Sequence, residues 1–363
     1  MTDATPHGGQ PSPPLPRVRL VDVAREAGLS KTTVSAALNG TGRLSPAVRE
    51  KARETARRMG YRPNATARRL RAGRARLIGY VVGEFADVPW TSLESPYFAR
   101  LTAATAATSL RRGYAVVLLP AGSLQSEWAD LSLDAVIVAD PVADDPVVED
   151  LLAARIPVLS DRSVEGRSGA YWVDVDAGGA VGEALDHVRA QGARRPVLVV
   201  PDSTTRFHTE VCAAHRAWCA AHGAPERVVR AGSPGNGPVI RAVETALAGD
   251  PAADGARPDA LLVVAEASPP LVLDAVRRLG LDVPGDVLLV CVSEDVTAEH
   301  TEPPVSTLSL RPEAIAEAGA EILVAVLEHG DREPSGVLVP TRLDVRASSV
   351  RPAQPAYTSR PPT

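Results

Sequence analysis

The chain has 363 residues, 45% of them hydrophobic, so it is long enough for two or three globular units with ample core. No run approaches the roughly 18 uninterrupted apolar residues of a membrane-spanning helix, and the N-terminus lacks the apolar region of a signal peptide. These features argue against a membrane protein and predict a cytoplasmic location. Three cysteines without a CxxC spacing fit a reducing compartment better than a disulfide framework.

The net charge of −5 hides a segregation along the chain. Residues 17–76 contain 16 Lys and Arg against 4 Asp and Glu, a net of +12, which leaves −17 for the rest. A basic module attached to an acidic body is expected when only one end of a protein binds nucleic acid. The alternative is a solvated basic face on an unrelated helical domain, and the motifs inside this segment disfavour it.

The first 16 residues are rich in Pro, Gly and polar residues, which predicts a disordered tail. Two short apolar patterns of helical spacing follow within residues 20–39, namely Leu20, Val23, Ala24 and Ala27, then Val34, Ala37 and Leu38. Gly28 separates them and suits the left-handed conformation that ends a helix. The pattern predicts a helix-turn-helix whose second helix lies in the major groove of DNA. The predicted outward residues of that helix are Lys31, Thr32, Ser35 and Ala36.

A third helix is predicted from Ser45 to Gly60. Ser45 supplies an N-cap, Pro46 suits the first helical position, and Gly60 can end the helix. Its apolar stripe, expected to close a three-helix core, consists of Val48, Ala52, Ala56 and Met59. A short basic helix is predicted beyond it, capped by Asn64 and ending near Gly73.

Three consecutive motifs, DVAREAG, TTVSAALN and GYRPNATARRLRAG, resemble the DNA-binding headpiece of the lactose-repressor (LacI) family. The resemblance implies a helix-turn-helix headpiece at residues 17–62, a hinge helix and linker at 63–76, and a homodimer that binds a pseudo-palindromic operator in double-stranded DNA, most often as a repressor. The expected DNA contacts are Lys31, Thr32, Thr33, Ser35, Ala36, Asn39, Asn64, Ala67, Arg68, Leu70 and Arg71. Leu70 matches the family's leucine that wedges into the minor groove, and packing on the body is its alternative role.

From Leu77 onward, short apolar runs alternate with helical stretches, which predicts a doubly wound α/β body with a parallel sheet covered on both faces. The predicted strands are 77–82, 114–119, 135–139, 156–160, 171–175, 196–200, 260–265 and 287–292, with a last strand at 337–350. By the resemblance, the body at 77–350 has the periplasmic-binding-protein type of fold. Its N subdomain would hold about 77–175 and 293–330, and its C subdomain about 176–292 and 331–350, joined by three crossings around a ligand cleft. Residues 351–363 are expected to fray.

Several residues match cleft positions of the family. Tyr97 and Phe98 offer rings for stacking, although Phe98 suits a core or dimer helix equally well. Arg162 follows a strand at the carboxyl end where α/β sheets bind ligands, and its alternative is a solvent-facing ion pair with Asp161. The expected effector contacts are Ser95, Tyr97, Phe98, Arg162, Asp174, Glu266 and Ser293, with Trp172 as further stacking surface.

Three departures from the family pattern bear on the effector. Val211 stands where the family often has arginine, Ala265-Glu266 replaces Asn-Asp, and Cys291-Val292-Ser293-Glu294 replaces Gly-Phe-Asp-Asp. These changes remove polar groups that grip a pyranose, so the expected effector is a small molecule less polar than a simple sugar. A vestigial pocket without an effector is the alternative.

The sequence contains no P-loop, no GxGxxG at a strand end and no HExxH, and its His and carboxylate residues show no catalytic or metal-binding spacing. We therefore expect neither an enzyme nor a cofactor. A solute-binding protein shares the body's fold but requires export and has no use for a basic headpiece.

Overall fold

The computed structural model describes residues 18–61, 75–82, 95–120, 128, 131–142, 144–164, 170–232, 235–248, 256–265, 267–330 and 336–352. The chain divides into two compact units, Met1–Ala75 and Arg76–Thr363. The predicted tails and most of the hinge segment lie outside the described residues. The same is true of six predicted contact residues, Asn64, Ala67, Arg68, Leu70, Arg71 and Glu266.

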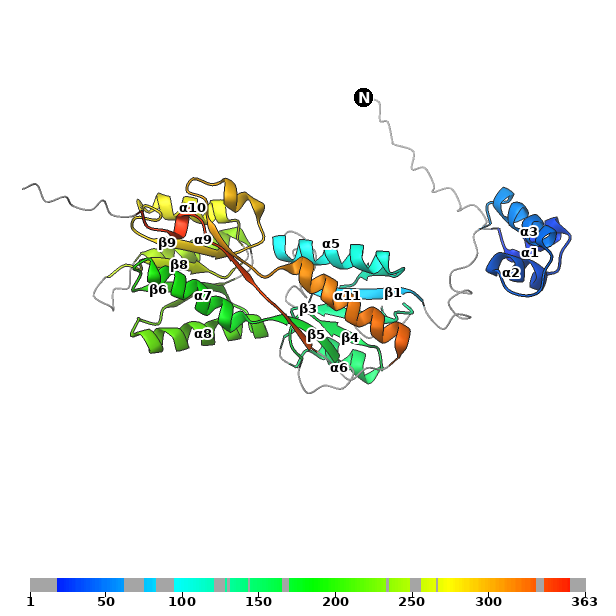
Figure 1. Ribbon diagram of the computed structural model, residues 1–363, viewed down its shortest axis with the longest axis horizontal. Helices are drawn as coiled ribbons and strands as arrows, with labels where there is room; N and C mark the ends of the chain where they lie inside the picture. Colours follow the sequence, from blue (N-terminus) through cyan, green and yellow to red (C-terminus); the bar gives the residue numbers. More distant parts are fainter. Residues whose placement is uncertain are drawn as a thin grey trace, which may run out of the picture. The chain divides into compact units, whose positions relative to one another are not determined.

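The headpiece consists of three helices, α1 (Leu20–Ala27), α2 (Lys31–Asn39) and α3 (Pro46–Arg58) (Figure 1). Gly28 ends α1 in the left-handed conformation with φ 64°, as predicted. Ser30 caps α2 by accepting a hydrogen bond from the Thr33 backbone N–H at 3.0 Å, and Ser45 caps α3 in the same way. The core residues are Val23, Ala24, Val34, Ala37, Ala52 and Ala56, which confirms the predicted three-helix core.

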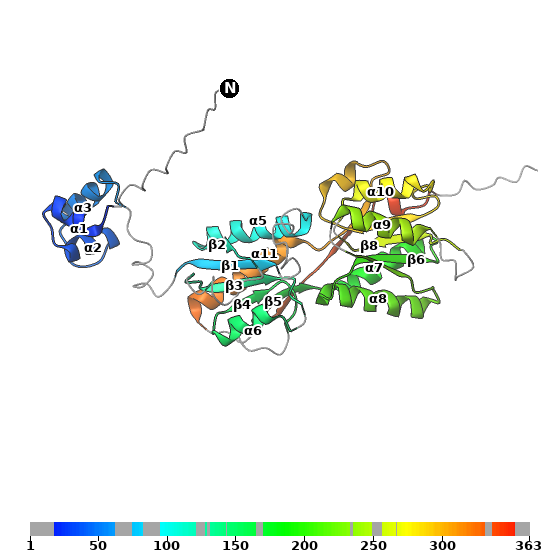
Figure 2. The same ribbon diagram turned by 180° about the vertical axis from the view of Figure 1, so that it is seen from behind.

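The first sheet of the body has the strand order β11-β5-β4-β3-β1-β2, and all its neighbouring strands are parallel. Its strands are β1 (Leu77–Val82), β2 (Ala115–Leu118), β3 (Ala135–Ala139), β4 (Val158–Ser160), β5 (Ala170–Val175) and β11 (Gly336–Val339). Helices α5 (Pro96–Arg111) and α11 (Pro312–His329) lie side by side on one face, and α6 (Pro146–Ala153) covers the other (Figures 1 and 2). Along β3, Ile137 packs in the core shared with α5 and α11, whereas Val136 and Val138 pack against α6.

The second sheet has the order β12-β10-β9-β8-β6-β7 and is parallel except for β12 against β10. Its strands are β6 (Pro196–Pro201), β7 (Val228–Ala231), β8 (Ala260–Val263), β9 (Leu288–Val292), β10 (Ser306–Ser309) and β12 (Arg342–Asp344). Helices α7 (Ala177–Ala190) and α8 (Arg206–His222) cover one face, and α9 (Asn236–Leu247) and α10 (Pro269–Arg278) the other (Figure 2). Helices on both faces of two largely parallel sheets confirm the predicted doubly wound α/β body.

The chain passes between the two sheets three times: after β5, after β10 and between β11 and β12. Two predicted boundaries differ from this path. Strand β10 belongs to the second sheet, although 293–330 was assigned to the N subdomain, and β11 belongs to the first sheet, although 331–350 was assigned to the C subdomain. The stretch 337–350 is therefore not one strand. Pro340 separates β11 from β12, because proline cannot donate a hydrogen bond to a strand ladder.

Strands β7, β10 and β12 were not predicted as separate strands. Their sequences VVRA, STLS and RLD are short and carry polar residues, so they lack the continuous apolar runs that marked the others. No helix in the described part of the chain is long and apolar enough to cross a membrane.

Candidate nucleic-acid interface and effector cleft

The exposed side of α2 carries the residues that can reach DNA. Thr32, Ala36 and Asn39 share one face because they are spaced i, i+4 and i+7 along the helix. Thr32 and Asn39 are exposed and Ala36 is half-buried. Lys31 is exposed at the N-terminus of the helix, and the half-buried Thr33 bonds through its hydroxyl to Ser30 Oγ at 2.7 Å. This face therefore presents short side chains, flanked by one cation.

Ser35 does not belong to that face. It is buried, and its Oγ accepts a hydrogen bond from Asn39 Nδ2 at 3.3 Å. The prediction that Ser35 faces outward is wrong, because Ser35 lies at the edge of the core-facing surface defined by Val34 and Leu38. Its hydroxyl instead orients the side chain of Asn39.

The described headpiece, residues 18–61, holds 9 Lys and Arg against 4 Asp and Glu, a net of +5. Most of these cations are exposed, among them Arg43, Lys51, Arg53 and Arg57. Arg58 pairs with Glu26 of α1 at 3.0 Å, so it ties α3 to α1. An exposed basic surface of this kind is suited to phosphate contacts.

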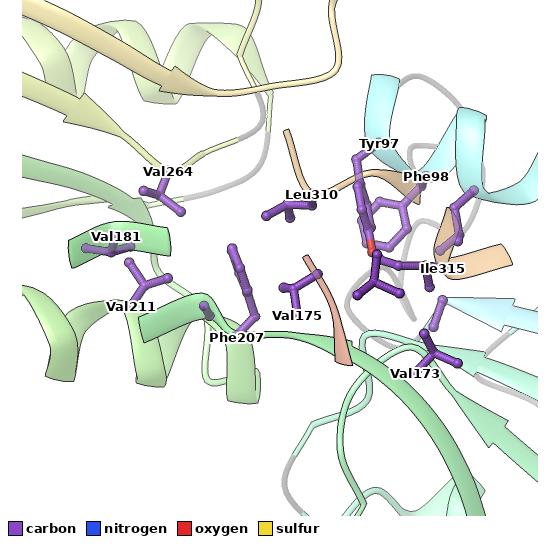
Figure 3. Packing of buried hydrophobic residues seen from close by; sticks show 14 of the residues in the cluster. Tyr97, Phe98, Val173, Val175, Val181, Phe207, Val211, Val264, Leu310 and Ile315 are labelled. Atoms are coloured by element: carbon purple, nitrogen blue, oxygen red, sulfur yellow. The ribbon is translucent and has the colours of Figure 1, made fainter. Parts of the chain in front are cut away.

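In the body, one cleft is lined by residues at the carboxyl ends of strands in both sheets. The space between these residues is about 770 Å³ when the part that is open to solvent is included. From the first half come the start of α5 and the residues after β3 and β4, namely Tyr97, Phe98, Asp140 and Arg162. The other half contributes Phe207, His208, Val264, Ser293 and Glu294, and the crossing after β10 contributes Leu310. Figure 3 shows Leu310 and Val175 between Phe207 of one half and the Tyr97 and Phe98 rings of the other.

Arg162 is the centre of a buried ionic cluster. Its side chain is 3% exposed and lies 3.2 Å from Asp140, 3.6 Å from Asp161 and 3.9 Å from Asp174, measured between the closest nitrogen and oxygen atoms. The guanidinium carbon also lies 5.6 Å from the ring centre of Tyr97 and 5.0 Å from that of Phe207. Arg162 is therefore not a solvent-facing residue at the rim, because it contacts aromatic rings from both halves of the body.

Tyr97 and Asp161 complete this cluster. The Tyr97 hydroxyl donates to Asp161 Oδ2 at 3.1 Å and accepts from Arg162 Nη1 at 3.3 Å. Burial raises the pKa of Asp161 to about 6, against the opposing effect of Arg162, and burial also raises the pKa of Tyr97 above its ordinary value. Three carboxylates around one arginine carry more negative than positive charge. Protonation of Asp161 reduces this excess of negative charge.

Two predicted effector contacts have structural roles instead. Asp174 does not line the cleft, and its carboxylate accepts backbone N–H bonds from Ser163 at 2.8 Å and Val175 at 2.7 Å. Ser95 caps α5 by accepting from the Phe98 N–H at 3.4 Å. Trp172 faces Gly336, where a Cβ atom would collide with its ring, so the tryptophan contributes no cleft surface.

His208 and Glu294 lie on the side of the cleft formed by the second sheet. Burial, reinforced by the charges of Arg162 and Arg230, lowers the pKa of His208 to about 3, so this imidazole is neutral at physiological pH. Glu294 accepts hydrogen bonds from Ser309 Oγ and from the Leu310 backbone N–H at 2.7 Å. Burial raises the pKa of Glu294, although these hydrogen bonds and Arg100 oppose the shift.

Comparisons with known proteins agree with both parts of this geometry. Residues 19–64 match the family model described as bacterial regulatory proteins, lacI family, and residues 185–349 match the periplasmic binding protein-like domain. The chain belongs to the LacI family. It is a DNA-binding transcriptional regulator, and its family consists of regulators rather than enzymes.

Relatives match over most of the chain. The HTH-type transcriptional regulator CelR of Thermobifida fusca is 27% identical over 342 residues, 92% of this chain and 98% of CelR. Catabolite control protein A of Staphylococcus xylosus is 22% identical over 341 residues, 92% of this chain and 99% of the relative. Among solved structures, the lac repressor dimer bound to operator and the anti-inducer ONPF has a TM-score of 0.76 at 19% identity, and the match covers 93% of this chain and 100% of the lac repressor chain. The CelR–cellobiose complex has a TM-score of 0.65 at 25% identity and covers 92% and 100%.

Of the predicted effector contacts in this LacI-family body, four line the cleft: Tyr97, Phe98, Arg162 and Ser293. Sequence reasoning missed Asp140, Phe207, His208 and Leu310, and it named Glu294 only as a departure from the family pattern. Asp140 directly follows β3, so its place after a strand was a usable signal, whereas Phe207 lies in the first turn of α8 and had no such signal. The apolar Val211 is fully buried in α8 and does not line the cleft.

Proposed function

We propose that this LacI-family regulator is a cytoplasmic repressor that binds a pseudo-palindromic operator as a homodimer and responds to a small-molecule effector in the cleft of its body. One observation carries the proposal: a basic helix-turn-helix unit shares a chain with a separate unit whose two sheets end at one cleft. Ligands of open α/β sheets bind at the carboxyl ends of strands, where this cleft lies.

On the DNA side, we propose that Thr32, Ala36 and Asn39 meet base edges in the major groove and that Lys31 contacts phosphate. Hydroxyl and amide groups can hydrogen-bond to bases, and the methyl groups of Thr and Ala can pack on thymine methyls. Ser35 supports this readout by holding Asn39. The hinge residues Asn64, Ala67, Arg68, Leu70 and Arg71 remain proposed contacts, with Leu70 as the minor-groove wedge.

Exposed apolar side chains on the body support a homodimer. Leu110 of α5 is 63% exposed and Leu118 of β2 is 52% exposed, while Leu271 of α10 is 44% and Val296 is 58% exposed. Helices α5 and α10 lie on the same side of the body in both views (Figures 1 and 2). A twofold interface formed by this side would cover these residues in both protomers and would place two headpieces for two half-sites.

For the effector, the state of the cleft's polar groups favours a molecule other than a simple sugar. Tyr97 OH, Ser293 Oγ and the Glu294 carboxylate already take part in hydrogen bonds within the protein. A sugar would present many hydroxyls to walls formed largely by Phe98, Phe207, Val264 and Leu310, and unpaired buried polar groups cost about 1–3 kcal/mol each. CelR is known in complex with cellobiose, so cellobiose is the most informative competing ligand.

The test uses the full-length protein in two assays. Genome-wide mapping of bound sites is expected to return a motif with twofold symmetry, and light scattering is expected to give the mass of a dimer. In a thermal-shift screen of metabolites that includes cellobiose, we expect a non-sugar compound to raise the melting temperature of the protein. A monomer on an asymmetric site would contradict the operator proposal, and a strong shift with cellobiose would contradict the effector proposal. If no metabolite shifts the body, the alternative of a vestigial pocket is supported.

A further inference from the structure

The buried charges that line the described part of the cleft or lie directly next to it do not balance. Four buried carboxylates, Asp140, Asp161, Asp174 and Glu294, accompany one buried cation, Arg162. Three of these carboxylates lie within 4 Å of Arg162, so the arginine is already offset by its own protein. The neutral imidazole of His208 adds no positive charge. A further anion would therefore enter a site with surplus negative charge, and Arg162 is poorly placed to receive it.

Glu294 is the carboxylate that stands apart from Arg162. Its side chain is 5% exposed and lines the cleft, and the cation within ion-pair distance is Arg100 at 3.6 Å, whose own side chain is 41% exposed and therefore screened by water. Glu294 accepts hydrogen bonds from Ser309 and Leu310. Because an ionised carboxylate has about four acceptor positions, Glu294 can accept a further hydrogen bond from a ligand. In an apolar pocket, a carboxylate of this kind is stabilised by a cationic hydrogen-bond donor.

Many of the other residues that line the cleft are apolar. Phe98 and Phe207 come from opposite halves of the body, with Leu310 between them, and Val264 lines the same cleft (Figure 3). Aromatic and branched aliphatic side chains favour a planar apolar group, which gains contact area without requiring further hydrogen bonds. The cleft thus combines Glu294, a buried carboxylate that lies apart from Arg162, with apolar side chains that can contact a ring.

We propose that the effector is a small organic cation, a protonated amine carried on a planar apolar body, with its ammonium group on Glu294 and its ring against Phe98 and Phe207. The inference rests on the effector cleft of the proposed function and names the class of molecule that binds there. The Arg162 cluster, in which three carboxylates surround one cation, then favours a neutral or hydrogen-bonding group at its end of the cleft and disfavours a carboxylate or phosphate.

The test compares compounds that share a ring and differ in charge. Two sets are used with the full-length protein at pH 7: phenethylamine, 2-phenylethanol and 3-phenylpropanoate, and tryptamine, tryptophol and indole-3-propanoate. Isothermal titration is expected to show that the amine of at least one set binds about 10-fold or more tightly than its alcohol, which corresponds to one charge-assisted hydrogen bond. The carboxylate of the same set is expected to bind more weakly than the alcohol.

Two variants assign the preference to its residue. Glu294→Gln keeps the shape of the side chain and is expected to remove the preference for the amine, while the alcohol still binds and shows that the cleft is intact. Glu313→Gln is the matched control, because Glu313 also contacts Arg100, at 3.5 Å, but is 53% exposed and does not line the cleft. It is expected to leave the ranking unchanged.

Equal or tighter binding of an alcohol or a carboxylate would overturn the proposal while leaving the effector cleft in place. An amine preference that survives Glu294→Gln would overturn the assignment to Glu294. Failure of all six compounds to bind would also overturn the amine proposal, and the metabolite screen described above then decides separately whether the cleft binds any effector.

Discussion

The headpiece and the body hold their functional groups in opposite ways. The headpiece has a core of six Val and Ala residues, and its proposed base contacts in the major groove are short side chains on one face of α2. The body buries a charged cluster at its cleft, with Arg162 and three aspartates enclosed where segments far apart in the sequence meet. Function in the headpiece therefore follows from spacing along one helix, whereas function in the body depends on tertiary structure.

The largest expected effect is a loss of stability that is confined to the body, caused by substitution of Arg162. The substitution Arg162→Ala leaves three buried carboxylates, Asp140, Asp161 and Asp174, without their cation. We expect this to lower the free energy of unfolding of the body by about 3–5 kcal/mol. Urea unfolding of the full chain, followed by Trp fluorescence, measures this loss, since all four tryptophans lie in the body. Arg206→Ala is the control, because Arg206 forms a 40% exposed pair with Glu210 and its loss is expected to cost less than about 1 kcal/mol. Similar losses for both variants would show that the cluster does not stabilise the body.

Arg162→Ala is consequently a poor probe of effector binding, because loss of the ligand response and loss of the fold would coincide. Variants at the apolar wall, such as Phe207→Leu, test the cleft with less damage to the ionic cluster.

The stability of the body is also expected to depend on pH through the buried Asp161. The pKa of Asp161 rises to about 6 in the folded body from an ordinary value of 3.8, so between these values the folded state binds more protons than the unfolded chain. This contribution to stability is present at pH 4 and is lost as the pH rises through about 6. Relative to Asp161→Asn, which cannot titrate, wild-type protein is expected to lose on the order of 3 kcal/mol between pH 4 and pH 7, since each pKa unit is about 1.4 kcal/mol. A difference that does not vary with pH would show that Asp161 remains ionised throughout.

On the headpiece, a substitution on the exposed face of α2 is expected to change specificity rather than stability. Ala36→Arg adds a side chain able to form a bidentate contact with guanine, worth about 1–3 kcal/mol of discrimination. Selection of bound sequences from a random DNA pool is expected to return a motif changed at one position in each half-site. Ser35→Ala is the comparison on the core side, and it is expected to weaken binding without introducing a new base preference. An unchanged motif for Ala36→Arg would mean that this face does not meet the bases.

The smallest expected effect concerns the cap of α2. Ser30→Ala removes the acceptor for the Thr33 N–H and is expected to cost about 1 kcal/mol of headpiece stability. Amide hydrogen exchange, which reports each unit separately, is expected to show faster exchange in residues 20–58 and no change in the body. Faster exchange in the body would contradict the independence of the two units.

These differences also explain what the sequence could predict. The helices of the headpiece and strands such as β1 and β3 were predicted to within about two residues, because local spacing, caps and continuous apolar runs define them. Strand β10, with the sequence STLS, was missed because its place is set by β9 and β12 rather than by its own composition. Tyr97 and Arg162 were placed at the cleft by motif. Asp140 was missed although it directly follows β3, and Phe207 was missed because only the fold brings α8 to Arg162.

The central claim is that the basic headpiece, and not the body, binds DNA. The most direct measurement is the affinity of the full-length protein for its mapped operator across a series of salt concentrations. A dimer that neutralises about 6–10 phosphates is expected to give a slope of log affinity against log salt of about −5 to −9. The chain lacking residues 1–76 is expected not to bind. A slope near zero, or operator binding by the truncated body, would contradict the account.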